Sequence, residues 1–167
     1  MKGLGIVLLA AALTAFGWQK SARLAGRART LQTVEHLCRR VGEEIRFTAA
    51  PPTQILTKIG GEEPFFSMPF LRNFCSVLPE KFHKTWNEQA TQFAKATGLS
   101  NEETACFCQF GSALGTTDLR GQQQLCAATQ ERFAQFYKTA QEEYREKGRL
   151  YVTLGGISGA AAALIML

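Results

Sequence analysis

The sequence predicts an all-α protein, a bundle of six helices carried between two apolar ends. Apolar residues recur every three or four positions through most of the chain, and no stretch alternates as a strand would. Both ends are runs without a charged side chain, at Gly3–Trp18 and Leu150–Leu167. Between these ends, the 167-residue chain has room for one domain of roughly 120 residues with its own core.

The first apolar run is predicted to be a retained membrane anchor. Its sixteen residues are short for a span, but Trp18 and Lys20 can extend it at the membrane interface. The alternative is a cleaved signal peptide, with Lys2 as the positive region and Ala10–Ala12 as the cleavage site. Cleavage there would leave the hydrophobic region too short, so the anchor is favoured. The alternative product would be a secreted or surface-anchored helical binding protein.

Two helices are expected after the anchor. Leu24–Phe47 has one apolar face, with Glu43, Glu44 and several arginines largely on the other. The run Ala49-Ala50-Pro51-Pro52 ends this helix, and Thr53–Ile59 forms a short helix before Gly60-Gly61.

A third and a fourth helix follow. The third is expected to begin near Pro64 or Ser67, because apolar residues there share one helical face. These residues are Phe66, Phe70, Phe74 and Val77. The fourth helix covers Lys81–Thr97 and ends at Gly98, and its inward residues are Phe82, Trp86, Ala90, Phe93 and Ala94.

The stretch Phe107–Leu125 is predicted to join the last two helices of the bundle in a sharp hairpin. Ser100 and Glu103 form a capping box that opens the fifth helix. Phe107, Phe110 and Leu114 then mark its buried face, while Gly111 and Gly115 allow a neighbouring helix to approach closely. Gly115 also suits the left-handed residue that closes a helix, and Asp118 can cap the next one.

The helix after Asp118 is expected to run for about thirty residues towards the C-terminus, because no proline interrupts its periodicity. Leu150–Leu167 follows, and eighteen apolar residues are about the minimum for a bilayer span. Gly155 and Gly159 lie four residues apart in it, a spacing that lets transmembrane helices pack closely. An equally simple interpretation is that glycine is common in short anchors.

The net charge of +5 favours a membrane over nucleic acid as the partner. Much of the excess lies beside the two apolar ends, at Lys20, Arg23, Arg27 and Arg29 and at Arg145, Lys147 and Arg149. By the positive-inside rule, the domain between the ends is cytoplasmic and both termini lie across the membrane. The expected divisions are an anchor at 1–19, a cytoplasmic helical domain at 20–149 and a transmembrane helix at 150–167.

No pattern of catalytic or metal-binding residues is present in the sequence. The two histidines, His36 and His83, lie on separate predicted helices, and there is no nucleophile elbow, phosphate-binding loop or zinc-protease motif. Five cysteines form no C-x-x-C pair and leave one over, which favours free thiols in a reducing compartment, mostly buried as small hydrophobes. They are Cys38, Cys75, Cys106, Cys108 and Cys126. We therefore expect neither an enzyme nor a cofactor or metal.

In layout and motifs, the chain resembles the stage III sporulation protein AB family of endospore-forming bacteria. The resemblance rests on three elements besides the two apolar ends: G-E-E-I-R-F at 42–47, A-P-P-T-Q-I-L at 50–56, and F-G-S-A-L-G-T-T-D at 110–118 with Gln122–Gln124 behind it. The F-G-x-x-L-G-x-x-D element is the most specific, and its fixed positions here are Phe110, Gly111, Leu114, Gly115 and Asp118.

This resemblance implies a soluble domain similar to the six-helix cytoplasmic domain of the type II secretion F platform protein. It also implies a place in the mother-cell membrane around the forespore, as a structural component of a secretion-like channel complex required for endospore formation. The implied partners are the membrane, other subunits of that complex and a cytoplasmic ATPase for which the protein is the platform. Assembly as a homo-oligomer is left open, and no catalytic residue is implied.

Overall fold

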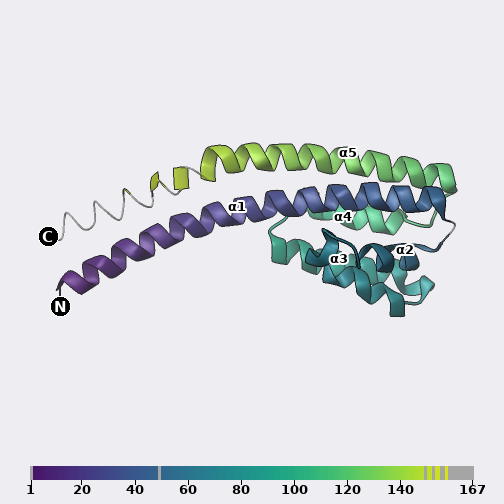
Figure 1. The fold of residues 1–167 in the computed structure, drawn as a ribbon, viewed down its shortest axis with the longest axis horizontal. Helices are drawn as coiled ribbons and strands as arrows, with labels where there is room; N and C mark the ends of the chain where they lie inside the picture. The colour runs from purple at the N-terminus through teal and green to yellow at the C-terminus, as the bar shows by residue number, and fades with distance from the viewer. Residues whose placement is uncertain (1, 49, 149, 152, 155–156, 158–167) are drawn as a thin grey trace. The chain divides into compact units, whose positions relative to one another are not determined.

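The computed structural model describes residues 2–48, 50–148, 150–151, 153–154 and 157, and every regular element among them is helical. The predicted all-α class is therefore confirmed. The chain divides into two compact units, which we call unit 1 (residues 1–28 and 138–167) and unit 2 (residues 29–137). Helices α1 and α5 each contribute residues to both units (Figure 1).

Helix α1 is one continuous helix, Lys2–Phe47, so the expected helix at Leu24–Phe47 continues towards the N-terminus. Helix α2, Pro52–Ile59, begins one residue before the predicted Thr53, with Pro51 extended at the N-cap and Pro52 as its first residue. Proline is suited to this position because its missing N–H would have no partner inside the helix.

The predicted third α-helix is wrong. The segment instead forms two 3-10 helices, η1 Phe65–Ser67 and η2 Pro69–Ser76, before a short η3 at Pro79–Lys81. A 3-10 helix has three residues per turn, so the buried side chains recur every third position. They are Phe65, Met68, Leu71 and Phe74, with Phe70 also buried.

This change of period also corrects the predicted buried face. Phe66 was expected in the core, yet it is 51% exposed and lies against the guanidinium of Arg72, whose carbon is 5.0 Å from the ring centroid. Val77 is only half-buried. Pro64, Pro69 and Pro79 remove backbone donors along this stretch, which favours short tight turns over one long α-helix.

Helices α3, Phe82–Thr97, and α4, Asn101–Ala113, follow the predicted pattern. Gly98 closes α3 in the left-handed region with φ 76°. The predicted capping box is confirmed, because the Ser100 side chain accepts from the Glu103 N–H and the Glu103 carboxylate accepts from the Ser100 N–H. The two helices are therefore joined by a short, fully capped turn.

Helix α5, Leu119–Glu143, passes into a π-helical turn, η4, at Tyr144–Gly148. Within unit 2, α1 and α5 pack closely where a Cβ on Gly42 would lie 3.0 Å from Cys126 Cβ, and the Gln130 amide donates to Glu35 at 2.9 Å. Within unit 1, the Arg27 guanidinium donates to Glu143 at 2.9 Å. The predicted long helix after Asp118 is confirmed.

An aromatic cluster around Trp86 forms the core of unit 2. The Trp86 ring centroid lies 5.0 Å from that of Phe107, 5.9 Å from Phe74 and 6.1 Å from Phe110, mostly in tilted or edge-on arrangements. Buried aromatic pairs of this kind add about 0.5–1.5 kcal/mol each beyond the area that they bury. The indole N–H donates to the Phe107 carbonyl at 3.0 Å, so the one polar atom of the ring is satisfied.

Neither predicted membrane segment is established by the structure. Within the described residues, no helix combines the length and the apolar character that a membrane crossing requires. The predicted segment at 150–167 lies mostly outside those residues, and so do Gly155 and Gly159. The predicted boundaries at residues 19 and 150 stay predictions.

Candidate functional site

Gly111 of α4 packs directly against Trp86 of α3. A Cβ built on this residue would lie 2.1 Å from Trp86 Nε1 and Cε2, far inside any real contact. Because the indole is fully buried and hydrogen-bonded to Phe107, it has little room to move. Glycine at this position is therefore required by the packing of the aromatic core.

Gly115 forms the turn after α4. Its φ of 79° lies in the left-handed region that L-residues with a Cβ rarely adopt. A Cβ there would also lie 3.0 Å from Pro52 Cγ, so the turn packs on the first turn of α2. Leu114, the C-cap residue of α4, is 1% exposed. The hairpin is thus held by backbone conformation and by packing together.

Asp118 and Gln122 satisfy the backbone groups that the turn leaves unpaired. The Asp118 carboxylate accepts from the Gly121 N–H at 3.0 Å, as an N-cap of α5 should. The Gln122 amide oxygen accepts from the Gly115 N–H at 3.0 Å, and its NH₂ donates to the Ala113 carbonyl and the Thr117 hydroxyl. Gln122 therefore connects the end of α4, the turn and the start of α5.

A shallow apolar groove of about 230 Å³ opens beside the hairpin. It is formed where the end of α1 and the start of α2 approach the turn. Its floor is buried, while Leu119 at its edge is 56% exposed. The lining residues include Val41, Ile45, Pro52, Leu114, Gly115 and Leu119. The five residues of the predicted hairpin motif lie between the last turn of α4 and the start of α5.

A buried carboxylate ties α1 to α2 on another side of unit 2. Glu44 is 6% exposed, although the sequence pattern placed it on the polar face of its helix, so that expectation is wrong. It accepts from Lys58 Nζ at 2.8 Å and lies 2.7 Å from Arg40 Nη2. Arg40 in turn donates to the Glu62 carboxylate at 2.9 and 3.1 Å. Hydrogen bonds from Lys58 and then Arg40 hold the Glu44 pKa below its ordinary 4.5.

This ion network predicts a specific loss of stability in acid. A depressed carboxyl pKa contributes stability that is present above the unfolded-state pKa and is lost as the pH falls through the folded-state pKa. Replacing Glu44 with glutamine should cost about 1–2 kcal/mol of unfolding free energy at pH 7, and that cost should shrink below about pH 4.5. Urea unfolding of both proteins between pH 3 and pH 7 measures it. A difference that is independent of pH would contradict the role given to Glu44.

Three of the five free thiols are buried, as the sequence pattern predicted. Cys38 and Cys126 lie in the contact between α1 and α5, and Cys106 lies on α4. Burial raises the pKa of Cys38 and Cys106 and raises that of Cys126 to about 12. Cys75 is exposed and Cys108 is half-buried. The three buried thiols therefore act as small apolar side chains and resist alkylation.

The histidines and potential metal ligands of the described residues are not gathered at one site. No group of three or more His, Cys, Asp or Glu side chains among them is placed to hold a metal ion. His83 lies with Nδ1 3.3 Å from the Gly111 carbonyl, and His36 lies 3.4 Å from the Glu35 carboxylate on the same helix. These arrangements place the two imidazoles on different helices and against different partners.

The comparison with protein families identifies the chain. A family model described as stage III sporulation protein AB matches residues 2–167. The chain belongs to the stage III sporulation protein AB family. This membership confirms the resemblance drawn from the 42–47, 50–56 and 110–118 motifs and assigns the protein to sporulation. No curated protein and no solved structure matches it, so similarity to the type II secretion F domain stays a prediction.

In this sporulation family member, the sequence locates the hairpin but does not predict two sets of contacts that hold it, those of Trp86 with Gly111 and those of Gln122. Trp86 was assigned to the core, yet its contact with Gly111 depends on the approach of two helices. Gln122 was quoted only as part of a polar triplet, and its three hydrogen bonds depend on the turn geometry. Gln122 is only 6% exposed. Its position four residues after Asp118 indicates this burial, because it places the side chain on the inward side of α5.

Proposed function

We propose that this protein is a membrane-anchored structural component of the channel complex between mother cell and forespore, with its soluble domain in the mother-cell cytoplasm. In this proposal it acts as a platform for a cytoplasmic ATPase and contacts other subunits of the complex. Membership of the sporulation protein family supports the cellular process. The membrane location is an inference from the distribution of charge and exposed apolar residues, and the partners are an inference from the resemblance to the family.

The observation that carries the membrane proposal is the contrast between the two units. Unit 1 holds eight lysines and arginines against three glutamates, a net +5, whereas unit 2 holds eleven basic and eleven acidic residues. The whole net charge of the chain therefore lies in the unit that carries both apolar ends. Basic residues flanking apolar segments are typical of the cytoplasmic boundary of a membrane helix.

Exposed apolar side chains are concentrated in the same unit. Trp18 is 72% exposed, Phe16 is 60% exposed and Ile157 is 61% exposed. Tyr144, Leu150, Tyr151 and Leu154 are between 39% and 58% exposed. Such a group of large apolar residues is costly in water, and aromatic residues among them are enriched at membrane interfaces. A lipid environment around this part of unit 1 would remove that cost.

We also propose that the role is structural rather than enzymatic. The described residues satisfy their own packing and hydrogen bonds around the hairpin, and the motif residues have structural contacts: Gly111 with Trp86, Gly115 with Pro52, and Asp118 with Gly121. A platform protein requires this kind of rigid, well-capped domain. Unit 2 would offer its surface to the ATPase and to neighbouring subunits.

Reporter fusions test the proposed topology. In the Gly60-Gly61 turn, a reporter that works only in the cytoplasm should be active, because the basic clusters retain unit 2 inside. After Leu167, only a reporter that works outside the cytoplasm should be active. Equal behaviour of the two fusions would contradict the proposal.

The alternative function, a secreted helical binding protein, requires cleavage near Ala10–Ala12. Helix α1 runs without interruption from Lys2 to Phe47, so this cut would fall inside a regular helix. The mass of the membrane-extracted protein separates the two functions: the intact chain supports the anchor, and loss of the first ten to twelve residues supports secretion.

A further inference from the structure

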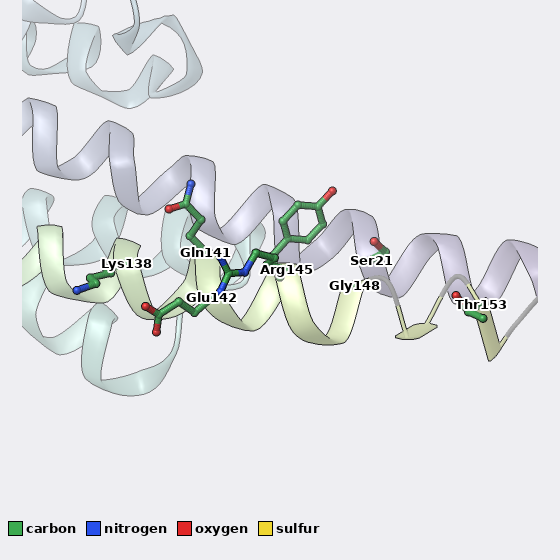
Figure 2. A pocket seen from close by; sticks show the side chains of 8 residues that line it. Ser21, Lys138, Gln141, Glu142, Arg145, Gly148 and Thr153 are labelled. Atoms are coloured by element: carbon green, nitrogen blue, oxygen red, sulfur yellow. The ribbon is translucent and has the colours of Figure 1, made fainter.

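Unit 1 contains a polar groove that the proposed structural role does not use. Its volume is about 910 Å³, and it is lined by Ser21 of α1 and by residues of α5, η4 and the segment that follows. Figure 2 shows Lys138, Glu142 and Arg145 succeeding one another along α5 and η4, with Ser21 on α1 close to Gly148. A Cβ on Gly148 would lie 3.1 Å from Ser21 Oγ, so the two helices are in contact at this end of the groove.

A break in the regular helix forms this end. Residues Tyr144–Gly148 make a π-helical turn, which widens the backbone by one residue and is often found at functional sites. Gly148 is buried, and a Cβ on it would lie 2.9 Å from the Tyr144 ring. Tyr144, Arg145 and Gly148 of this turn line the groove together with Ser21 of α1.

The cations of this region differ in their partners. Arg27 donates to Glu143, and Lys147 lies 2.9 Å from the other oxygen of the same carboxylate, so both cations are paired with this one anionic group. Among the residues that the structure describes, Arg145 and Lys138 form no ion pair, although both line the groove together with Glu142. With Lys138 and Arg145 against the single carboxylate of Glu142, the lining carries a net positive charge, which favours an anionic ligand.

The position of the groove indicates which anion. If the bilayer begins next to residues 19 and 150, as the proposed function requires, Ser21 and Gly148 lie in the first turn outside the hydrocarbon. Arg145 is three residues from Gly148, about 4.5 Å along a helix, which is within a headgroup layer of roughly 5–8 Å per leaflet. Lys138 is ten residues away, about 15 Å, which is beyond that layer.

We propose that the groove of unit 1 binds the headgroup of an anionic phospholipid, with Arg145 as the charge that contacts the phosphate and with the hydroxyl groups of Ser21 and Tyr144 in the lining of the same groove. Guanidinium groups bind phosphate oxygens in a bidentate manner, and basic pockets between membrane helices are typical sites for anionic headgroups. This inference rests on the proposed membrane location. It gives Arg145 a specific ligand, whereas under the positive-inside rule Arg145 only helps to set the orientation of the chain in the membrane.

The test uses the full chain in nanodiscs, with three matched variants. Arg145→Gln removes the proposed phosphate contact, Lys138→Gln removes the groove cation outside the headgroup layer, and Lys95→Gln removes one exposed charge from unit 2. Retained lipids are measured by native mass spectrometry after incorporation into phosphatidylcholine alone or mixed with phosphatidylglycerol. Free inorganic phosphate is added in a parallel sample as a competitor, and circular dichroism checks that each variant stays folded.

The parent protein should retain phosphatidylglycerol in preference to phosphatidylcholine. Arg145→Gln should weaken that preference about fivefold, which is the effect of one cation near an anionic surface. The changes at Lys138 and Lys95 should alter the preference for phosphatidylglycerol less than about twofold. Millimolar phosphate should not displace the lipid.

Several results would overturn the headgroup site. The first is equal retention of both lipids by the parent protein. The second is an equal loss of lipid preference in Lys95→Gln and Arg145→Gln, and the third is displacement of phosphatidylglycerol by free phosphate. Incorporation into pure phosphatidylcholine tests the membrane proposal separately, because it does not require the anionic headgroup. A protein that enters neither kind of nanodisc would contradict the proposed function, and the headgroup site would fall with it.

Discussion

Replacing Gly111 with alanine will destabilise the protein, although alanine is the better helix former. The added methyl would lie 2.1 Å from the Trp86 indole, which is fully buried and held by its bond to Phe107. We expect a loss of about 1–3 kcal/mol from overpacking for Gly111→Ala and a larger loss for Gly111→Val. Urea unfolding of a fragment covering residues 24–145, followed through the fluorescence of Trp86, measures both.

Gly26 provides the matched control for this change. It is also a glycine within a helix, and nothing lies within 4 Å of a Cβ built on it. Gly26→Ala should therefore stabilise the fragment by up to about 1 kcal/mol, through helix propensity alone. Urea midpoints for Gly111→Ala that equal or exceed the parent's would show that Gly111 does not determine the α3–α4 packing.

Gly115→Val will have the second large effect, for a different reason. The left-handed φ of 79° costs a β-branched residue about 1–2 kcal/mol, and the contact 3.0 Å from Pro52 adds to this. Asn tolerates the left-handed region better than other residues with a Cβ, so Gly115→Asn should lose clearly less than valine. Asp118→Ala, which removes only the cap of α5, should cost about 1 kcal/mol.

The order of these three losses separates backbone strain from packing. A turn held by its left-handed glycine is supported if Gly115→Val loses more unfolding free energy than Gly115→Asn, and if Asp118→Ala loses about as little as Gly115→Asn. If asparagine and valine are equally damaging, the contact with Pro52 is the dominant constraint. If all three variants unfold at the same urea midpoint as the parent, the turn does not organise the fold, and the pairing of α4 with α5 must have another cause.

The parts of the fold that the sequence predicted are those determined by local interactions. The Ser100–Glu103 capping box, the helix end at Gly98 and the cap at Asp118 each depend on residues within four positions of one another. The hairpin motif could also be located, because the spacing of Phe107, Phe110 and Leu114 describes a single helical face. Local chemistry was sufficient at these points.

The errors arose where the type of helix or a distant residue decides which side chains are buried. Phe66 and Phe65 are adjacent phenylalanines, and only the three-residue period of a 3-10 helix selects Phe65 for the core. Glu44 is polar and was assigned to solvent, but α2 brings Lys58 to within 2.8 Å of it. A buried carboxylate of this kind cannot be distinguished from a surface one until its partners are placed.

Labelling of Cys75 in intact cells tests the central claim, that unit 2 is held at the cytoplasmic face of a membrane. Cys75 is exposed, whereas Cys38, Cys106 and Cys126 are buried with raised pKa values, about 12 for Cys126, so Cys108→Ser leaves one readily reactive thiol. A second variant replaces Cys75 and Cys108 with serine and adds one cysteine after Leu167. The variants are expressed in vegetative cells, in which the far side of the membrane is open to the medium. With a membrane-impermeant maleimide, Cys75 should react only after permeabilisation and the added cysteine should react in these intact cells. Reaction of Cys75 in intact cells, or protection of both thiols until lysis, would contradict the account.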